Sequence, residues 1–260
     1  MTRFKNLEFE SPGSDDRRSA EAPGPQSVPV EAAGWLERAD RERRQGHYEE
    51  ALRYYSRALE IDKSVVPGWV GQVQMLVLLD ELTEAELWSR KAIELFPGNG
   101  DLIAARAQAL VRRGDQRSGM SACDAALQQT GNSWYRWLVR GELMLAARQS
   151  TDTACFEKAE QSDRDWLVPL EAALICLYHD APAKALQRIR KSVEMSPAEP
   201  YVWLVQARAQ QELGQDRAAR TSLEQVLSLS PGHRDAEDRL ENLGSKVGQS
   251  WRWVRSWLRR

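Results

Sequence analysis

Residues 32–65 read AAGWLERADRERRQGHYEEALRYYSRALEIDKSV, and residues 67–99 read PGWVGQVQMLVLLDELTEAELWSRKAIELFPGN. When the two stretches are aligned with a shift of 34 residues, Trp35 falls on Trp69, Ala51 on Ala85 and Ala58 on Ala92. A fixed period of this length indicates a repeat architecture, in which each unit buries its apolar face against its neighbours.

The same spacing continues along the chain and divides it into six units. Small and aromatic residues recur at matching positions of the later units, among them Gly119, Ala126, Phe156, Ala159, Ala173, Ala185, Trp203, Ala207 and Ala219. The fourth unit needs a one-residue deletion to stay in phase. The unit boundaries predicted from this register are 32–65, 66–99, 100–133, 134–165, 166–199 and 200–233.

This pattern resembles the tetratricopeptide repeat family, whose unit is an antiparallel helix pair of the same length. The resemblance implies an all-α fold, a right-handed α-solenoid of stacked helix pairs. Alanine and glycine at the helix crossings would let the two backbones approach closely. The turn inside a unit often requires a positive φ, and it holds Gly46, Gly114 and Gly214. Prolines would end the second helix of three units, at Pro97, Pro197 and Pro231.

The segments outside the six units differ in composition. Residues 1–31 hold four of the eleven prolines among Ser, Gly, Asp and Glu, so we expect a disordered arm there. Residues 3–10 of this arm are either a solvated chain end or a short linear motif that folds into a groove. The apolar side chains of that motif would be Phe4, Leu7 and Phe9. Residues 234–247 have apolar side chains at helical spacing, which predicts a capping helix.

The last segment, residues 248–260, is rich in tryptophan and arginine. On a helical wheel its arginines separate from its apolar side chains, which is typical of a basic amphipathic helix. Such a helix could bind an anionic membrane surface, dock on a partner or a second copy, or pack back on the sixth unit as a lid. The residues predicted to make these contacts are Trp251, Arg252, Trp253, Val254, Arg255, Trp257 and Leu258.

Composition and motifs argue against catalysis and against nucleic-acid binding. The formal net charge is -2, whereas a nucleic-acid-binding domain is usually basic. No nucleotide-binding loop, zinc motif or nucleophile motif occurs, so no catalytic residue, metal or cofactor is expected. The register puts His47, His179 and His233 at turns, and we interpret them as solvated. Three scattered cysteines and the absence of a long apolar run favour the cytoplasm.

The first helices of a solenoid line its concave face, which in this family usually holds a peptide or a partner helix. The carboxylate clamp of chaperone-tail binders is absent, because its expected positions hold Leu36, Asp40, Gly71, Asp101 and Ala105. The face is instead apolar, and a large exposed apolar patch usually marks an interaction site. The residues predicted to form this partner-binding groove are Val70, Val77, Leu78, Val111, Tyr135, Leu138, Val139, Leu145, Leu167, Leu170, Leu174, Leu177, Tyr178, Tyr201 and Leu204.

These features favour a non-catalytic adaptor or assembly scaffold. Its groove would bind an apolar peptide or an amphipathic helix of a protein partner, and its tail would add a second attachment to a membrane surface or partner. One alternative is a structural subunit that packs permanently in a larger complex or homo-oligomer. Another is a regulatory subunit of an enzyme, because a binding module carries no signature of what its partner does.

Overall fold

The computed structural model describes residues 29–131 and 133–244. Within these residues every regular element is an α-helix, and there are thirteen of them. They are α1 (Val30–Arg44), α2 (Tyr48–Ile61), α3 (Val66–Leu78), α4 (Leu82–Leu95), α5 (Gly100–Arg112), α6 (Gln116–Gln128), α7 (Trp134–Ala146), α8 (Asp152–Ser162), α9 (Leu167–Tyr178), α10 (Pro182–Met195), α11 (Pro200–Glu212), α12 (Asp216–Leu229) and α13 (Arg234–Gly244).

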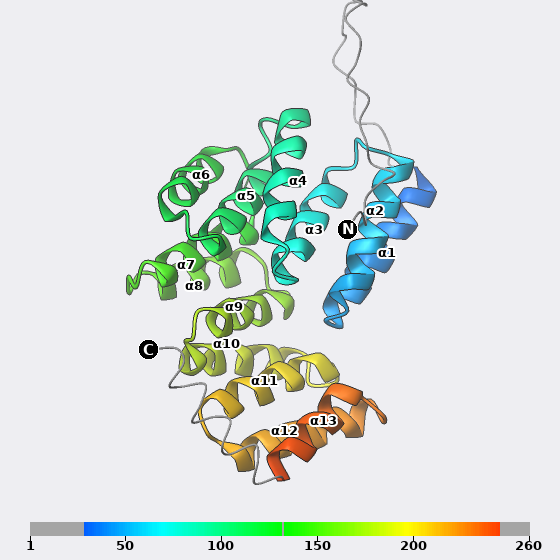
Figure 1. The fold of residues 1–260 in the computed structure, drawn as a ribbon, viewed down its shortest axis with the longest axis vertical. Helices are drawn as coiled ribbons and strands as arrows, with labels where there is room; N and C mark the ends of the chain where they lie inside the picture. The colour runs from blue at the N-terminus through cyan, green and yellow to red at the C-terminus, as the bar shows by residue number, and fades with distance from the viewer. Residues whose placement is uncertain (1–28, 132, 245–260) are drawn as a thin grey trace, which may run out of the picture.

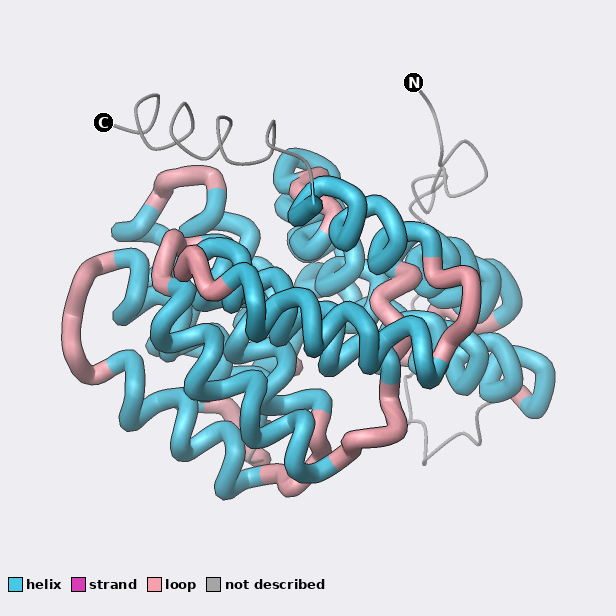
Figure 2. The backbone as a smooth tube through the Cα atoms, turned by 90° about the horizontal axis from the view of Figure 1, so that it is seen from below, coloured by secondary structure: helices cyan, strands magenta, loops and turns pink. Residues whose placement is uncertain are grey.

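The first twelve helices form six antiparallel pairs, and α13 packs on α12. Each pair also packs against the next pair along the chain, which makes the fold an all-α solenoid. The pairs follow an arc, so the turn between α1 and α2 points toward α11 (Figure 1). In the view of Figure 2 the helices lie in rows that are joined by short loops at their ends.

The turns inside the pairs show why the repeat keeps glycine there. Gly46, Gly114 and Gly214 have φ values of 81°, 91° and 74°, which confirms the prediction of a positive φ. The equivalent turns of the other three pairs use non-glycine residues in the same region, at Asp80, Arg148 and Asp180. Asparagine and aspartate tolerate this conformation better than most side chains, whereas an arginine there is uncommon.

Small residues at the helix crossings let neighbouring helices approach closely, as the sequence predicts. A Cβ atom added at Gly71 would lie 2.3 Å from the ring of Tyr55, and one at Gly141 would lie 2.5 Å from the ring of Phe156. The alanines at the repeated crossing positions have no exposed surface: Ala39, Ala51, Ala58, Ala85, Ala92, Ala126, Ala159, Ala173, Ala185, Ala207 and Ala219. These contacts form one continuous core along the solenoid.

The three prolines predicted to end second helices do lie beyond a helix end. Pro97 follows the end of α4 at Leu95, and the same holds for Pro197 after α10 and Pro231 after α12.

The linear motif at residues 3–10 and the tail at residues 248–260 lie outside the described residues. Of the segment predicted as a capping helix, α13 covers the part up to Gly244.

Candidate functional site

The inner face of the solenoid is where the sequence predicts the binding groove, and most of that face is buried. Ten of the fifteen predicted residues are buried: Val77, Val111, Tyr135, Leu138, Val139, Leu167, Leu170, Leu174, Tyr201 and Leu204. Four are half-buried, namely Val70, Leu78, Leu145 and Leu177, whereas Tyr178 is 44% exposed. In this structure the face is therefore filled by its own side chains, because the first helices of successive units pack against one another.

A buried ionic cluster lies within the inner face, centred on Glu142 of α7. Its carboxylate accepts hydrogen bonds from Gln108 Nε2 at 2.6 Å and Arg112 Nε at 2.7 Å. His179 Nε2 lies 3.0 Å from the same carboxylate, although the sequence analysis interprets this histidine as solvated. Tyr135 extends the cluster, because its hydroxyl donates to Gln108 Oε1 at 2.7 Å. The cluster thus joins α5, α7 and the end of α9.

The neighbours of Glu142 keep its carboxyl group ionised. Burial alone would raise the pKa of this carboxyl group, but Arg112 and His179 outweigh that effect and lower the pKa of Glu142 to about 2. Burial raises the pKa of the neighbouring Tyr135 hydroxyl well above its usual value. The cluster therefore consists of a carboxylate paired with a guanidinium, beside a neutral phenol. Every one of these groups is already engaged within the fold.

The inner face keeps some exposed surface where three of the first helices end. We call this surface the C-end rim and define it as Leu78 of α3, Leu145 of α7, and Leu177 and Tyr178 of α9. The Arg112 side chain of α5 packs against the Tyr178 ring and is itself only 3% exposed. Arg112 stacks on the Tyr178 ring with its guanidinium carbon 4.1 Å from the ring centre, and it donates to the Val77 carbonyl at 3.1 Å. The Tyr178 hydroxyl donates to Asp80 Oδ1 at 3.4 Å. Tyrosine is a residue type enriched in interaction hot spots, and Tyr178 is the exposed member of this stacked pair.

The first unit reaches across the solenoid and contacts the fifth and sixth units. Arg43 Nε donates to Glu171 Oε1 at 2.9 Å, and Arg44 Nη1 donates to Asp165 Oδ1 at 2.9 Å. The Tyr48 and Tyr201 hydroxyl oxygens lie 2.7 Å apart. These pairs are separated by 121 to 153 residues in sequence. The chain therefore closes on itself at this edge.

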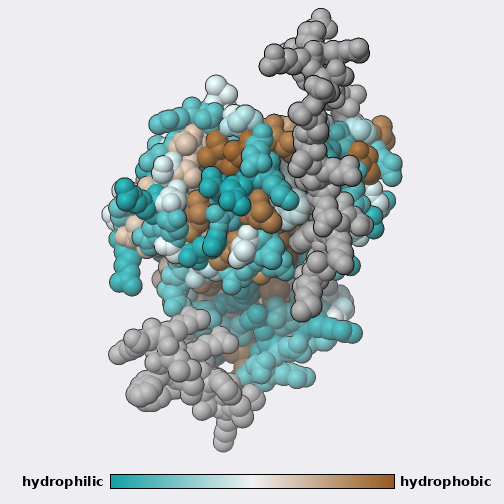
Figure 3. All heavy atoms as spheres, turned by 45° about the horizontal axis from the view of Figure 1, so that its top comes forward, coloured by the Kyte–Doolittle hydropathy of each residue, from teal (hydrophilic) through white to brown (hydrophobic). Residues whose placement is uncertain are grey.

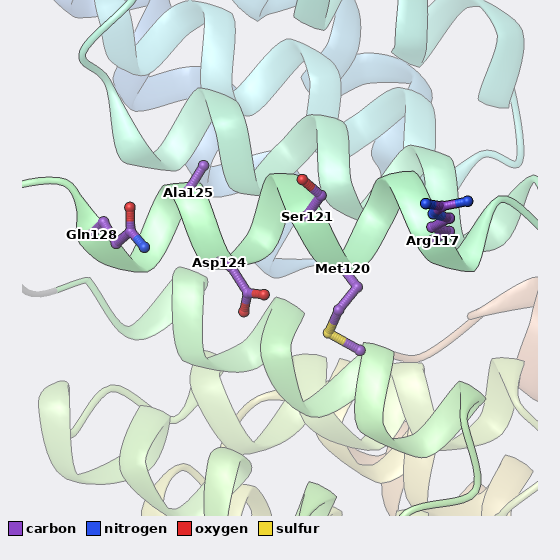
Figure 4. A pocket seen from close by; sticks show the side chains of 6 residues that line it. All are labelled: Arg117, Met120, Ser121, Asp124, Ala125 and Gln128. Atoms are coloured by element: carbon purple, nitrogen blue, oxygen red, sulfur yellow. The ribbon is translucent and has the colours of Figure 1, made fainter.

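Two of the hollows on the described surface lie at the closure and along α6. A cavity of about 180 Å³ lies at the closure, lined by Asp40, Arg43, Arg44, Trp134, Asp163, Asp165, Leu167 and Val168. A shallow hollow lies along α6, where Met120 and Asp124 point to the same side of the helix (Figure 4). Arg140 of α7 occupies that side, because it donates to Asp124 Oδ1 at 2.6 Å. Figure 3 shows hydrophobic residues on one face in patches bordered by hydrophilic ones.

Neither hollow assembles a catalytic set. In the described part of the chain, no group of three or more His, Cys, Asp and Glu side chains could hold a metal ion. Cys123 and Cys176 are fully buried, and burial raises their thiol pKa values to about 11 and about 12. Such thiols are poor nucleophiles. Among residues 29–131 and 133–244, no helix is both long enough and apolar enough to cross a bilayer.

The buried polar residues of the inner face are not among the site residues predicted from the sequence. One signal was present, because Gln74, Gln108 and Glu142 recur at the same 34-residue spacing as the apolar positions. All three are buried. A polar residue that keeps the register of a packed helix face indicates a hydrogen-bonded partner inside the fold. No such periodic signal marks Arg43 and Glu171, whose pairing depends on the curvature of the whole solenoid.

Comparison with known proteins gives matches at both ends of the solenoid. Residues 32–64 and residues 200–233 each match a family profile described as tetratricopeptide repeat. These segments correspond to α1–α2 and α11–α12. A search of curated proteins gave no match.

Several solved structures share the fold at low sequence identity. The human IFIT1 dimer with m7Gppp-AAAA is 19% identical with a TM-score of 0.54, over 80% of this chain and 52% of that chain. TTC0263, a thermophilic TPR protein of Thermus thermophilus, is 15% identical with a TM-score of 0.50, over 82% of this chain and 98% of that one. The Cut9–Hcn1 hetero-tetramer of the APC/C is 16% identical with a TM-score of 0.50; the match covers 82% of this chain but only 43% of that chain.

At these identities the likeness shows the fold alone, and it agrees with the two profile matches. The repeat period, the six helix pairs and the buried small residues at the crossings all follow the same pattern. The chain is a tetratricopeptide repeat protein.

Proposed function

We propose that this protein is a non-catalytic adaptor or assembly scaffold that binds an apolar peptide or an amphipathic helix of a protein partner on the inner side of its solenoid. Tetratricopeptide repeat folds support protein–protein interaction in general, because stacked helix pairs present an extended curved surface. The C-end rim is the part of the predicted groove that a partner reaches first. Three free cysteines fit a reducing compartment, so we propose the cytoplasm as its location.

The observation that carries this proposal is the exposed Tyr178 ring stacked on Arg112. Arg112 is held by the buried Glu142 carboxylate, so the ring lies on a rigid support. A preorganised aromatic side chain loses little conformational entropy when a partner covers it. The half-buried leucines around it supply apolar area for a helix or an extended segment. The buried residues of the predicted groove contribute only if the inner face opens.

The tail at residues 248–260 adds a second part to the proposal. This segment lies outside the described residues. Its role is supported by the sequence, because on a helical wheel the arginines and the tryptophans fall on different faces. We propose that it attaches the scaffold to an anionic membrane surface or to a further subunit. Two attachments on one rigid body raise the effective concentration of the second contact.

The rim is tested with a fluorescent amphipathic peptide that carries leucine on one face and lysine on the other. Tyr178→Ala should weaken its binding to the full chain by about tenfold, which is the usual size of an aromatic hot-spot effect. Met195→Ala is the matched control, because Met195 is similarly exposed at 47% but lies on α10, outside the rim. Fluorescence anisotropy titrations measure both affinities. Equal binding by wild type and the Tyr178 variant would remove the rim from the proposal.

A further inference from the structure

The closure between the first unit and the fifth and sixth units is unusual for a solenoid, in which each unit contacts only its neighbours. Four residues of the first unit make it: Arg43, Arg44, Gly46 and Tyr48. We call them the clasp. The backbone of Gly46 lies against the Tyr201 ring so closely that an added Cβ atom would be 2.3 Å from a ring carbon.

The clasp consists of charged and polar side chains and the Gly46 backbone, and unlike the Glu142 cluster it joins units that are far apart in sequence. Its charged pairs are Arg43 with Glu171 and Arg44 with Asp165. The second pair is partly exposed, with side-chain exposures of 36% and 29%, so water competes well for both partners. The first pair is buried, and the attraction within such a pair roughly offsets the cost of removing both charges from water. The clasp therefore fixes the position of the first unit relative to α9 and α11 but contributes little to the net stability of the fold.

The backbones at the closure do not pack closely. Helix α1 packs on α2 and α3, but it is not among the helices that pack extensively on α9 or α11. Apart from the Gly46 backbone against the Tyr201 ring, side chains bridge this gap, including Arg43 over the Trp134 ring at 5.8 Å and Arg44 over the Trp166 ring at 5.3 Å. A joint made of long side chains can open without breaking any helix pair.

Behind the clasp lie apolar residues that the sequence assigns to the groove. Glu171, the partner of Arg43, is on the same helix as Leu167 and Leu170, and Tyr201 itself contacts the clasp. Opening the clasp would uncover Leu167, which lines the cavity at the closure beside the two clasp arginines, and the Tyr201 ring that Gly46 covers. These two side chains would form the accessible start of an apolar groove.

We propose that the clasp is an autoinhibitory contact that closes the inner face, and that an apolar segment of a partner binds tightly only when the clasp is released. This inference rests on the proposed function, because it concerns the same face. A partner that binds only the open state shifts the population toward it by its difference in affinity for the two states. The C-end rim offers a first contact while the clasp is still closed.

Charge reversal at the Arg44–Asp165 ion pair tests the clasp. Two single variants should open it, and a double variant that restores the ion pair should close it again. Arg44→Glu places two carboxylates opposite each other and should open the closure. Asp165→Arg alone places two guanidinium groups together and also removes the acceptor of the Leu167 backbone N–H at the start of α9. The double variant Arg44→Glu, Asp165→Arg restores an opposite pair. Small-angle scattering of the full chain should show a larger radius of gyration for each single variant and a return toward wild type for the double variant.

A second pair of variants opens the joint by steric means. Gly46→Ala and Gly114→Ala introduce the same backbone strain, since both glycines have positive φ, at 81° and 91°. Only the first also forces the Tyr201 ring to move, because nothing lies within 4 Å of a Cβ atom at Gly114. Hydrogen exchange should therefore rise in α1 and in the first turn of α9 for Gly46→Ala and stay near wild type there for Gly114→Ala.

The amphipathic peptide described above links opening to binding. Opened variants should bind it about tenfold more tightly than wild type, and the double charge-swap variant should not. An unchanged radius of gyration and unchanged hydrogen exchange in Arg44→Glu and Gly46→Ala would contradict the proposal that the clasp closes the inner face. This conclusion would not depend on the affinity for the peptide. Opening without a gain in affinity would overturn the inhibitory role alone, because the proposed function is judged separately by the Tyr178 variant of the closed chain.

Discussion

At the scale of single residues, Glu142 shows how this fold stabilises a buried charge. It has no exposed surface, yet it remains ionised, because Arg112, Gln108 and His179 surround it. Removing one partner of a buried pair is costly, since the other charge is left without compensation. The same guanidinium supports Tyr178 at the rim, so the buried pair and the exposed ring are mechanically linked.

Glu142→Gln should lower the free energy of unfolding at neutral pH by about 3 kcal/mol. The pKa of Glu142 is about 2 in the folded chain, below its value of 4.5 when unperturbed. Its contribution to stability is therefore present above about pH 4.5 and is lost as pH falls toward 2. Urea unfolding midpoints across this range should fall less steeply for the variant than for wild type. Parallel slopes would mean that the pKa of Glu142 is the same in the folded and the unfolded chain.

At the scale of elements, α9 is the helix that most changes the interpretation of the groove. Its sequence, LVPLEAALICLY, is apolar on all sides, and a helix of that kind is buried rather than half-exposed. Residues 167–176 are all buried in the structure. Replacing Leu138, Leu170 or Leu174 with glutamate would therefore disrupt packing before it could report on partner binding.

Leu170→Ala should destabilise the protein by about 2–5 kcal/mol, because it leaves a cavity in a packed interior. Met195→Ala, at a 47% exposed position on α10, should change stability by no more than about 0.5 kcal/mol. Chemical denaturation followed by circular dichroism compares the two midpoints. A small effect at Leu170 would show that the inner face is loosely packed in solution.

At the scale of the whole molecule, the curvature of the solenoid decides what is accessible. Each pair rotates slightly relative to the last, and four to five such steps bring α1 and α2 back to α9 and α11.

The tail is best tested on the intact chain against a version ending at Ser250. If it binds membranes, only the full chain should sediment with anionic liposomes, and less of it should do so at high salt, because screening weakens the arginine contacts. Neutral liposomes serve as the control. Light scattering on the same samples detects self-association. Equal sedimentation of both versions would exclude the tail as a membrane contact.

The sequence by itself determines the repeat, the helix pairs, their turns and their crossing residues. These features are local or involve neighbouring units, so they repeat every 34 residues, as Ala51 and Ala85 do. Only the tertiary structure decides that the inner face is filled and that the first unit closes on the fifth and sixth. Arg43 and Glu171 lie 128 residues apart, and no period connects them. Their meeting depends on small rotations that add up over every pair, which a pattern within one unit does not contain.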